Sequence, residues 1–261
     1  MKYVIIGGDN RFACLERLLK KRGDDVFRIC GSATVREASA ELGSADCIVM
    51  NHPVMGEGCG FTLDKVCIAA KRSARIYLAG PKAADLLDER IVDIWADETL
   101  KTDNAAYTAE GAIAAAMQAS TKSIRECSCL VIGWGRIGKA LTEMLVGMGV
   151  RVTVASRSVS SRNRAIERGA VAVNTDHLRI SGFDIIFATP PAMVLHDKIL
   201  KKAEKDVMIL DLASPPYGVD LKAAWENGLR AWREPGLPGR YCPESAAKAI
   251  IRAIDRAETG K

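Results

Sequence analysis

The sequence has few histidines and few aromatic residues. Its 261 residues include 3 histidines, and phenylalanine, tryptophan and tyrosine together make up 5%. The 37 basic and 32 acidic residues leave a formal net charge of +5, without a basic block anywhere in the chain. Nucleic-acid-binding proteins usually cluster basic residues and place aromatic residues among them. The composition therefore argues against that class and leaves anionic small molecules as candidate partners.

Long hydrophobic runs are also missing. A membrane-spanning helix needs roughly 18 apolar residues in a row, and no segment approaches that length. The first segment, MKYVIIGGDNR, loses its apolar character after a few residues, unlike a secretory signal peptide. We therefore expect a cytoplasmic protein, and its 48% hydrophobic residues are enough for a substantial core.

No CxxC pair occurs among the eight cysteines. Several of them lie in apolar runs, which favours buried thiols in a reducing compartment. Cys127 and Cys129 lead directly into a predicted strand, and the only imidazoles are those of His52, His177 and His196. These positions do not suit a metal site, and we predict none.

Predicted strands and helices alternate from end to end, a pattern typical of parallel sheets with crossover helices. In the first part we expect strands at 3–7, 26–30, 46–50, 74–79 and 91–96. A second series begins at Cys129 and continues near 150–155, 170–173, 184–189, 207–213 and 229–232. The second series has six strands, which is the number in a complete dinucleotide-binding domain.

The connections between the two series predict the domain boundaries. Residues 97–103 are charged and are interpreted as a linker, and the alanine-rich segment after them suits a long helix. The last segment begins with Pro243 and carries an apolar helix face that needs a cover, so we place it back on the first domain. The predicted organisation is an N-terminal domain (1–103), an interdomain helix (104–126), a Rossmann domain (127–240) and a returning C-terminal helix (241–261).

A glycine motif marks the start of the second series. Gly133, Gly135 and Gly138 form a GxGxxG pattern that follows an apolar strand and opens a helix, which is the context that makes the pattern informative. The first glycine permits a tight turn, the second a close approach to a pyrophosphate, and the third close packing of helix and strand. A purely structural turn is the alternative. The predicted cofactor-binding residues here are Gly133, Trp134, Gly135, Arg136, Ile137 and Gly138.

No carboxylate stands where an NAD-binding protein usually carries one. The second strand of the series ends on Ser156, Arg157 and Ser158. Asp or Glu at this place binds the ribose 2'-hydroxyl, whereas an arginine can pair with the 2'-phosphate of NADP(H) and serines can donate to its oxygens. We therefore predict NADP(H), with NAD as the weaker alternative and a solvated loop arginine as the alternative to both.

Ligands of such sheets bind beyond the carboxyl ends of the strands. Tyr217 lies in such a loop and could move a proton, although a turn tyrosine is more often only packed. Asp211 is interpreted as structural. The other predicted cofactor contacts after the fourth and fifth strands are Thr189, Pro190, Leu212, Ala213 and Ser214.

The first domain and the long helix offer candidates for the substrate. Arg11 follows a glycine turn and could bind a carboxylate, or it could be an ordinary arginine at a helix start. His52 follows the third strand and could move protons, with a loop histidine of no chemical role as the alternative. Glu110 lies among small residues, where burial would be costly without a partner, so we predict a network in a cleft and a role in proton transfer.

Several phrases coincide in order and spacing with one family. They are TAEGAI at 108–113, VIGWGRIG at 131–138, DLAS with PxG at 211–218, and PGLPG with Pro243. Together with the opening GGDxR at 7–11, they resemble the A subunit of dipicolinate synthase nearly end to end.

The resemblance implies a flavodoxin-like N-terminal domain and a Rossmann domain related to hydroxyacid and alanine dehydrogenases. Members act with a flavoprotein-like B subunit in the branch off lysine biosynthesis that makes pyridine-2,6-dicarboxylate (dipicolinate) for spores. The implied reaction is oxidation of dihydrodipicolinate, or of 4-hydroxy-tetrahydrodipicolinate, by NADP+. Cations for the dianionic substrate could come from Arg11 with Arg240 or Lys82, and Thr108 is placed at the same site. A homo-oligomer is expected as well.

Two other functions fit the same architecture. One is an NADP-dependent reductase of a hydroxy or keto acid, which usually needs a Glu-paired histidine that this sequence does not offer in the cofactor domain. The other is a scaffold that binds NADP(H) while a partner performs the chemistry.

Overall fold

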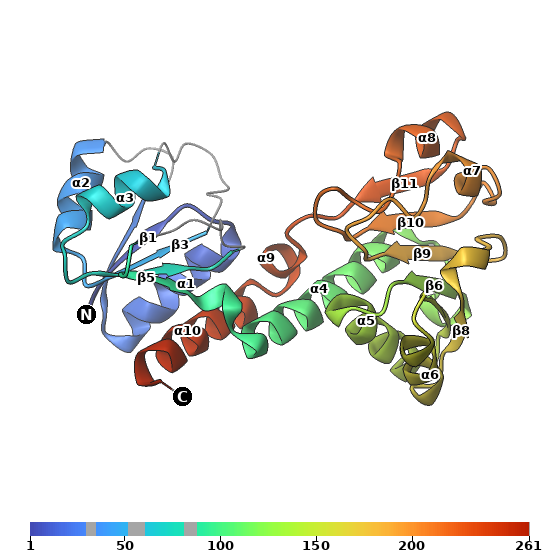
Figure 1. Cartoon of the computed structure of the whole chain (residues 1–261), viewed down its shortest axis with the longest axis horizontal. Helices are drawn as coiled ribbons and strands as arrows, with labels where there is room; N and C mark the ends of the chain where they lie inside the picture. Colours follow the sequence, from blue (N-terminus) through green and yellow to red (C-terminus); the bar gives the residue numbers. More distant parts are fainter. Residues whose placement is uncertain (30–34, 52–60, 81–87, 261) are drawn as a thin grey trace. The chain divides into compact units, whose positions relative to one another are not determined.

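The structure is a computed structural model that describes residues 1–29, 35–51, 61–80 and 88–260, the side chains of 35–37 excepted. The chain divides into two compact units. Unit 1 comprises Met1–Asn104 and Pro238–Lys261, and unit 2 comprises Ala105–Leu237. Both are α/β units built on parallel sheets (Figure 1), and the predicted fold class is confirmed.

The described residues of unit 1 form a five-stranded parallel sheet in the order β2-β1-β3-β4-β5. This is the flavodoxin-like order, with a reversal between β1 and β3. The central strands are apolar and buried except for Lys2 and Arg75 at their first positions, as expected of strands covered on both faces. The strands are β1 (Lys2–Ile6), β2 (Asp25–Ile29), β3 (Cys47–Met50), β4 (Arg75–Leu78) and β5 (Ile91–Asp93).

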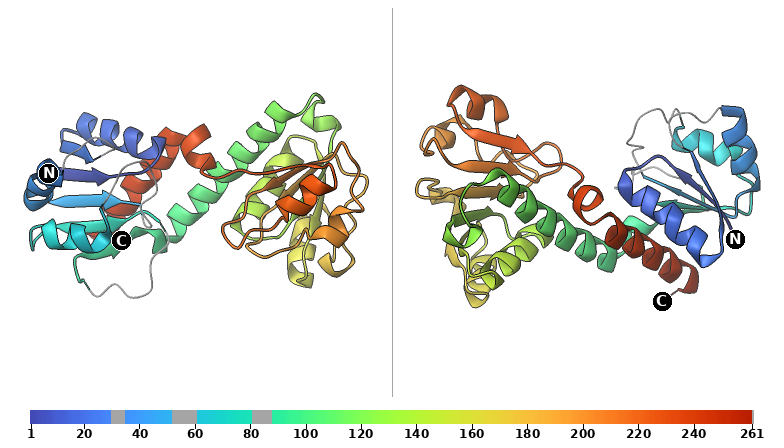
Figure 2. Two further views of the ribbon diagram at one scale, coloured as in Figure 1. Left: turned by 90° about the horizontal axis from the view of Figure 1, so that it is seen from above. Right: turned by 180° about the vertical axis from the view of Figure 1, so that it is seen from behind.

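Helices cover both faces of this sheet. On one face, alternate residues of β1, β3 and β4 pack against α2 and α3 in a single apolar cluster. On the other face α1 and α10 lie side by side (Figure 1 and Figure 2). The C-terminal helix therefore fills a helix position of the first sheet, as predicted. The helices are α1 (Asn10–Arg22), α2 (Val35–Ser44), α3 (Leu63–Ala69) and α10 (Pro243–Thr259).

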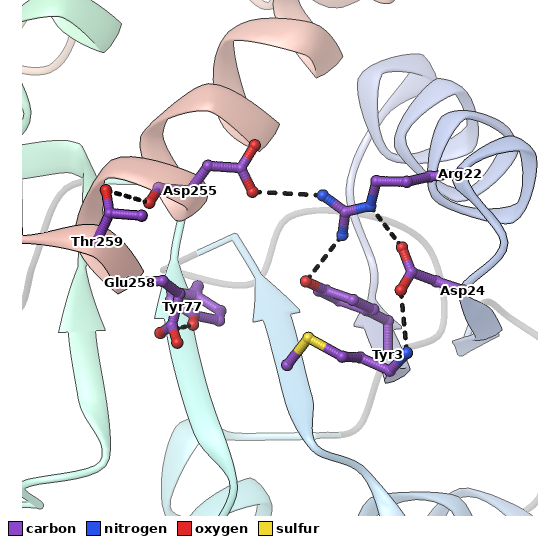
Figure 3. A network of polar contacts seen from close by, with 8 residues as sticks. Tyr3, Arg22, Asp24, Tyr77, Asp255, Glu258 and Thr259 are labelled. Carbon is purple, nitrogen blue, oxygen red and sulfur yellow. Dashed lines mark hydrogen bonds and ion pairs between the residues drawn. The ribbon is translucent and has the colours of Figure 1, made fainter.

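Polar contacts join α10 to the rest of unit 1 (Figure 3). Arg22 donates to Tyr3 Oη at 3.0 Å and to Asp255 at 3.3 Å. The buried Tyr77 donates its hydroxyl to Glu258 near the end of α10. Burial raises the pKa of Tyr3 to about 12 and also raises the pKa of Tyr77. Both tyrosines therefore stay protonated and neutral at physiological pH, which suits their position under the helix.

The charged stretch 97–103 is helix, so the predicted linker is wrong. β5 ends at Asp93, a 3-10 turn η1 covers Ile94–Ala96, and α4 runs from Glu98 to Ala119. Asp97 starts the helix by accepting a hydrogen bond from the Leu100 N–H at 2.7 Å. Arg256 donates to the same carboxylate at 2.7 and 2.9 Å and holds the pKa of Asp97 below its usual value. The charges cap and anchor the helix.

Unit 2, whose residues are all described, contains a six-stranded parallel sheet in the order β11-β10-β9-β6-β7-β8. This is the complete Rossmann order, which reverses between β9 and β6. A 3-10 turn at Ile124–Glu126 precedes it. The strands are β6 (Ser128–Ile132), β7 (Arg151–Ala155), β8 (Val171–Val173), β9 (Ile185–Ala188), β10 (Met208–Asp211) and β11 (Arg230–Arg233); the helices are α5 (Arg136–Gly147), α6 (Val159–Glu167), α7 (Asp197–Leu200) and α8 (Leu221–Glu226), with α9 (Leu237–Tyr241) at the boundary of the units.

Throughout the described ranges, no helix is both long enough and apolar enough to cross a membrane.

Candidate functional site

The turn between β6 and α5 depends on two of its glycines for packing. Gly133 has φ 98°, and its N–H donates to the Ala155 carbonyl at 2.9 Å. A Cβ on Gly133 would lie 2.5 Å from the Thr189 hydroxyl oxygen, and one on Gly138 would lie 2.3 Å from the Gly133 carbonyl oxygen. Glycine is therefore required at both positions by the protein itself.

Gly135 differs from its neighbours because a Cβ there would meet no atom of the described residues within 4 Å. It is the N-cap of α5, and as a glycine it has no side chain to cap this helix. A helix start of this kind offers N–H donors and the positive end of the helix dipole to an anion. Arg136 is exposed beside it, and Trp134 and Ile137 are half-buried. The geometry suits the predicted pyrophosphate site, where a bound group would occupy the open space at Gly135.

The loop after β7 ends in a short cap. Ser158 is the N-cap of α6, and its hydroxyl oxygen accepts from the Ser161 N–H at 3.3 Å. Because the oxygen accepts that bond, the hydroxyl proton is still available for a ligand. Arg157 is exposed at the start of this loop, and Ser156 is half-buried.

Arg162 is a residue of this loop that sequence reasoning missed. Its guanidinium donates to the Ser156 carbonyl at 2.8 Å and to the Arg157 carbonyl at 2.7 Å. It therefore fixes the backbone that carries Arg157 and adds a second positive charge there. Its distance in sequence from Ser158 could have indicated this role, because a residue four positions after the N-cap lies over the first turn of the helix.

The loops after β9 and β10 lie at the same carboxyl edge of the sheet. The Thr189 hydroxyl donates to the Ile132 carbonyl at 2.8 Å and so ties the β9 loop to the glycine turn. The predicted contacts comprise half-buried Thr189 and Pro190, buried Leu212, half-buried Ala213 and exposed Ser214.

Asp211 organises the loop after β10. Its side chain is fully buried. The carboxylate accepts from the N–H groups of Ala213 at 3.2 Å, Gly218 at 3.3 Å and Val219 at 3.3 Å. Arg233 lies 3.6 Å away through Nε. These contacts support the structural interpretation of Asp211.

Tyr217 lies under an arginine that sequence reasoning also missed. The Arg233 guanidinium carbon is 3.6 Å from the centroid of the Tyr217 ring. Tyr217 has φ 69°, a left-handed conformation that is rare outside glycine, and its N–H donates to the Ser214 carbonyl at 2.9 Å. The ring is therefore held in place by its backbone and by the arginine above it.

In unit 1, the Arg11 side chain pairs with Asp9 at 2.8 Å through Nε. Asp9 is also the N-cap of α1 and accepts from the Arg11 N–H. A Cβ on Gly239 would lie 2.5 Å from the Asp9 carboxylate, which explains the second glycine of PGLPG. Arg11 is thus fixed by a neighbouring carboxylate, and its role in substrate binding stays a prediction.

The remaining candidates for the substrate and for proton transfer belong to several elements. Thr108 is buried on α4, whereas Glu110 on the same helix is exposed. The cleft network and the role in proton transfer expected for Glu110 stay predictions. Arg240 is exposed, 5.3 Å from the Tyr241 ring centroid. His52 and Lys82 lie outside the described residues.

In the described ranges, no three His, Cys, Asp or Glu side chains are grouped so as to hold a metal ion. Burial raises the pKa of the Cys129 thiol to about 12 and also raises that of Cys127. Both therefore stay as protonated thiols.

Comparisons with known proteins agree with this architecture. The family model "D-isomer specific 2-hydroxyacid dehydrogenase, NAD binding domain" matches residues 92–213. The A subunit of dipicolinate synthase from Bacillus subtilis (strain 168) is 27% identical over 295 residues, covering 100% of this chain and 99% of that protein.

Solved structures show the same fold. The dipicolinate synthase A subunit from Bacillus halodurans has a TM-score of 0.80 at 22% identity and covers 98% of this chain and 97% of its own. The apo-structure of D-lactate dehydrogenase from Escherichia coli has a TM-score of 0.63 at 16% identity, with 100% and 98% covered. The resemblance to the family of dipicolinate synthase A subunits, predicted from the sequence motifs, is thereby confirmed over the whole chain.

Proposed function

We propose that this chain is an NADP-dependent oxidoreductase component that forms dipicolinate. The observation that carries the proposal is the glycine turn at the reversal point of the second sheet, with open space at Gly135, the N-cap of the helix that follows. Similarity to a dehydrogenase NAD-binding domain supports a nicotinamide cofactor and an oxidoreductase role. The full-length similarity to the A subunit of dipicolinate synthase supports the substrate class.

The charges at the end of β7 favour NADP(H) over NAD(H). Arg157 is exposed, and Arg162 lies beneath its backbone. No acidic residue occupies 156–158, where a carboxylate would repel a 2'-phosphate. A bidentate arginine and two serine hydroxyls could instead hold that phosphate.

Reversing the charge at Arg157 tests the cofactor assignment. Arg157→Asp should weaken NADP(H) binding by about 1.5 to 3 kcal/mol, the usual scale for a charged hydrogen bond. Titration of NADPH fluorescence measures this change. Arg164→Asp is the matched control, because Arg164 is exposed on helix α6, which follows the loop of Arg157, and the change in net charge is identical. Equal affinities of the two variants would contradict the assignment.

The proposed reaction removes two electrons from a cyclic dicarboxylate. Dihydrodipicolinate gives up a hydride to NADP+ and a ring proton to a base, and the hydroxylated tetrahydro form also loses water. The product ring is aromatic, which drives the reaction forward. The protein must hold a dianion against the nicotinamide and receive the proton. Glu110 and Tyr217 are proposed for the proton, and Arg11, Arg240, Thr108 and His52 for the substrate.

An assay with the purified chain tests the function. The chain is mixed with NADP+ and freshly generated cyclised intermediate, and absorbance follows NADPH and the pyridine dicarboxylate. Formation of both products in equal amounts supports the enzyme. If both appear only after the flavoprotein-like B subunit is added while the chain alone binds NADPH, the chain is a scaffold or an obligate partner of that protein. The B subunit, a homo-oligomer, spore formation and a cytoplasmic location stay predictions.

A further inference from the structure

Arg233 ends β11 at the carboxyl edge of the second sheet. It pairs in register with Asp211, the last residue of β10. Arg233 Nε lies 3.6 Å from the Asp211 carboxylate, whose side chain has no exposed surface. The Arg233 side chain is itself 40% exposed. One side of the guanidinium is therefore anchored in the protein, while another side faces solvent.

Tyr217 fixes the plane of this guanidinium. The 3.6 Å between the guanidinium carbon and the ring centroid is close contact for a cation stacked on an aromatic face. The ring cannot easily leave, because Tyr217 is held by its N–H bond to Ser214 and by the Asp211 contacts to the next two residues. Stacking of this kind pre-orders a flexible side chain and so lowers the entropic cost of binding a ligand.

The outer nitrogens of Arg233 have donors to spare. Arginine carries five N–H groups, and the contact with Asp211 engages Nε. In the part of the chain that the structure describes, no hydrogen bond engages the Nη groups of Arg233. The carboxylate of the adjacent Glu234 does not occupy these Nη groups; it accepts a hydrogen bond from Trp232 Nε1 at 2.6 Å. The Nη pair thus forms an open fork suited to a carboxylate.

The sheet order places this fork on the nicotinamide half of the proposed site. A dinucleotide crosses the reversal point of a Rossmann sheet, here between β9 and β6. Arg157, proposed for the adenosine phosphate, follows β7 on one side of that point. Arg233 ends β11 on the other side, beyond β9 and β10. We propose that Arg233 binds a carboxylate of the substrate, with the Tyr217 ring as its platform.

The inference rests on the proposed function and assigns a substrate-binding residue to it. The competing explanation is that Arg233 only neutralises the buried Asp211. The two explanations predict different effects of Arg233 on the affinity for a carboxylate ligand. A residue that only neutralises Asp211 would affect stability, whereas a ligand-binding fork would set the affinity for dicarboxylates and change the affinity for the cofactor little.

Arg233→Gln and Arg233→Lys provide the test. Calorimetry with pyridine-2,6-dicarboxylate in the presence of NADPH, and KM for the cyclised intermediate, measure substrate binding; NADPH fluorescence alone measures cofactor binding. We expect Arg233→Gln to weaken dicarboxylate binding and to raise KM at least tenfold. The dicarboxylate affinity and KM of Arg233→Lys should lie between those of Arg233→Gln and the unmodified chain. The NADPH affinity of both variants should change less than twofold. Arg230→Gln, at the other end of the same exposed strand, is the matched control and should change neither.

The outcomes separate the inference from the proposed function. If NADPH does not bind the unmodified chain, the proposed function fails. If NADPH binds but the dicarboxylate affinity of Arg233→Gln equals that of the control, Arg233 is a neutralising residue and the inference is overturned. Tyr217→Leu should weaken dicarboxylate binding more than Tyr217→Phe, because phenylalanine keeps the aromatic ring. A larger loss of dicarboxylate binding in Tyr217→Phe than in Tyr217→Leu would contradict the role of the ring as a platform for Arg233.

Discussion

Gly133→Ala is expected to lower the free energy of unfolding by about 3 kcal/mol, from a strained left-handed backbone and from overpacking. The φ of 98° is unfavourable for any residue with a Cβ. The added carbon would also meet the Thr189 hydroxyl at 2.5 Å. That hydroxyl cannot move without losing its bond to Ile132. Chemical denaturation with circular dichroism measures the change.

Gly135→Ala is the matched control for this prediction. Its φ of −76° suits any residue, and the added carbon meets no atom of the described residues. Loss of a favourable N-cap residue and reduced entropy of the unfolded chain each contribute less than about 1 kcal/mol with opposite signs, so stability should change little. Binding of NADPH should nevertheless weaken at least tenfold, since the carbon would fill the space proposed for the pyrophosphate. Equal losses of stability in the two variants would contradict the separate roles of the two glycines.

Asp211→Ala is expected to destabilise the protein by about 2 to 6 kcal/mol, because each of two buried N–H groups left without an acceptor costs about 1 to 3 kcal/mol. The N–H groups of Gly218 and Val219 would be left buried without an acceptor, and Arg233 would lose its anchor. Thermal and denaturant unfolding measure the loss. Hydrogen exchange should also rise for the N–H groups of Ala213, Gly218 and Val219.

Asp197→Ala is the control for Asp211. The Asp197 side chain is 43% exposed and pairs with Lys201 on the same helix turn. Exposed pairs of this kind contribute about 0.2 to 1 kcal/mol. If Asp211→Ala were no more destabilising than Asp197→Ala, the organising role of the buried carboxylate would be wrong.

Much of the fold was predictable because the signals were local. Apolar strands such as β6 are bounded by turns, and the glycine pattern around Gly135 fixes both the strand end and the helix start. The apolar face beginning near Ala246 indicated that the last helix must be covered. The sequence also predicted which loops share the carboxyl edge of the second sheet.

The errors come from side-chain contacts that a linear sequence does not show. The charges around Asp97 suggested a linker, but that carboxylate caps a helix and binds Arg256 from 159 residues away. Arg162 and Arg233 carried no motif, and their importance follows from the carbonyls and the ring they contact.

The division of unit 1 between Met1–Asn104 and Pro238–Lys261 also matters during synthesis. The ribosome releases the five strands of the first sheet long before α10 is made. Until then the face of the sheet under α10, which includes Tyr77, has no cover from that helix. Unit 2 is continuous and can complete its own core first. The nascent chain should therefore complete the Rossmann fold of unit 2 before the flavodoxin-like fold of unit 1, although most of unit 1 is synthesised first.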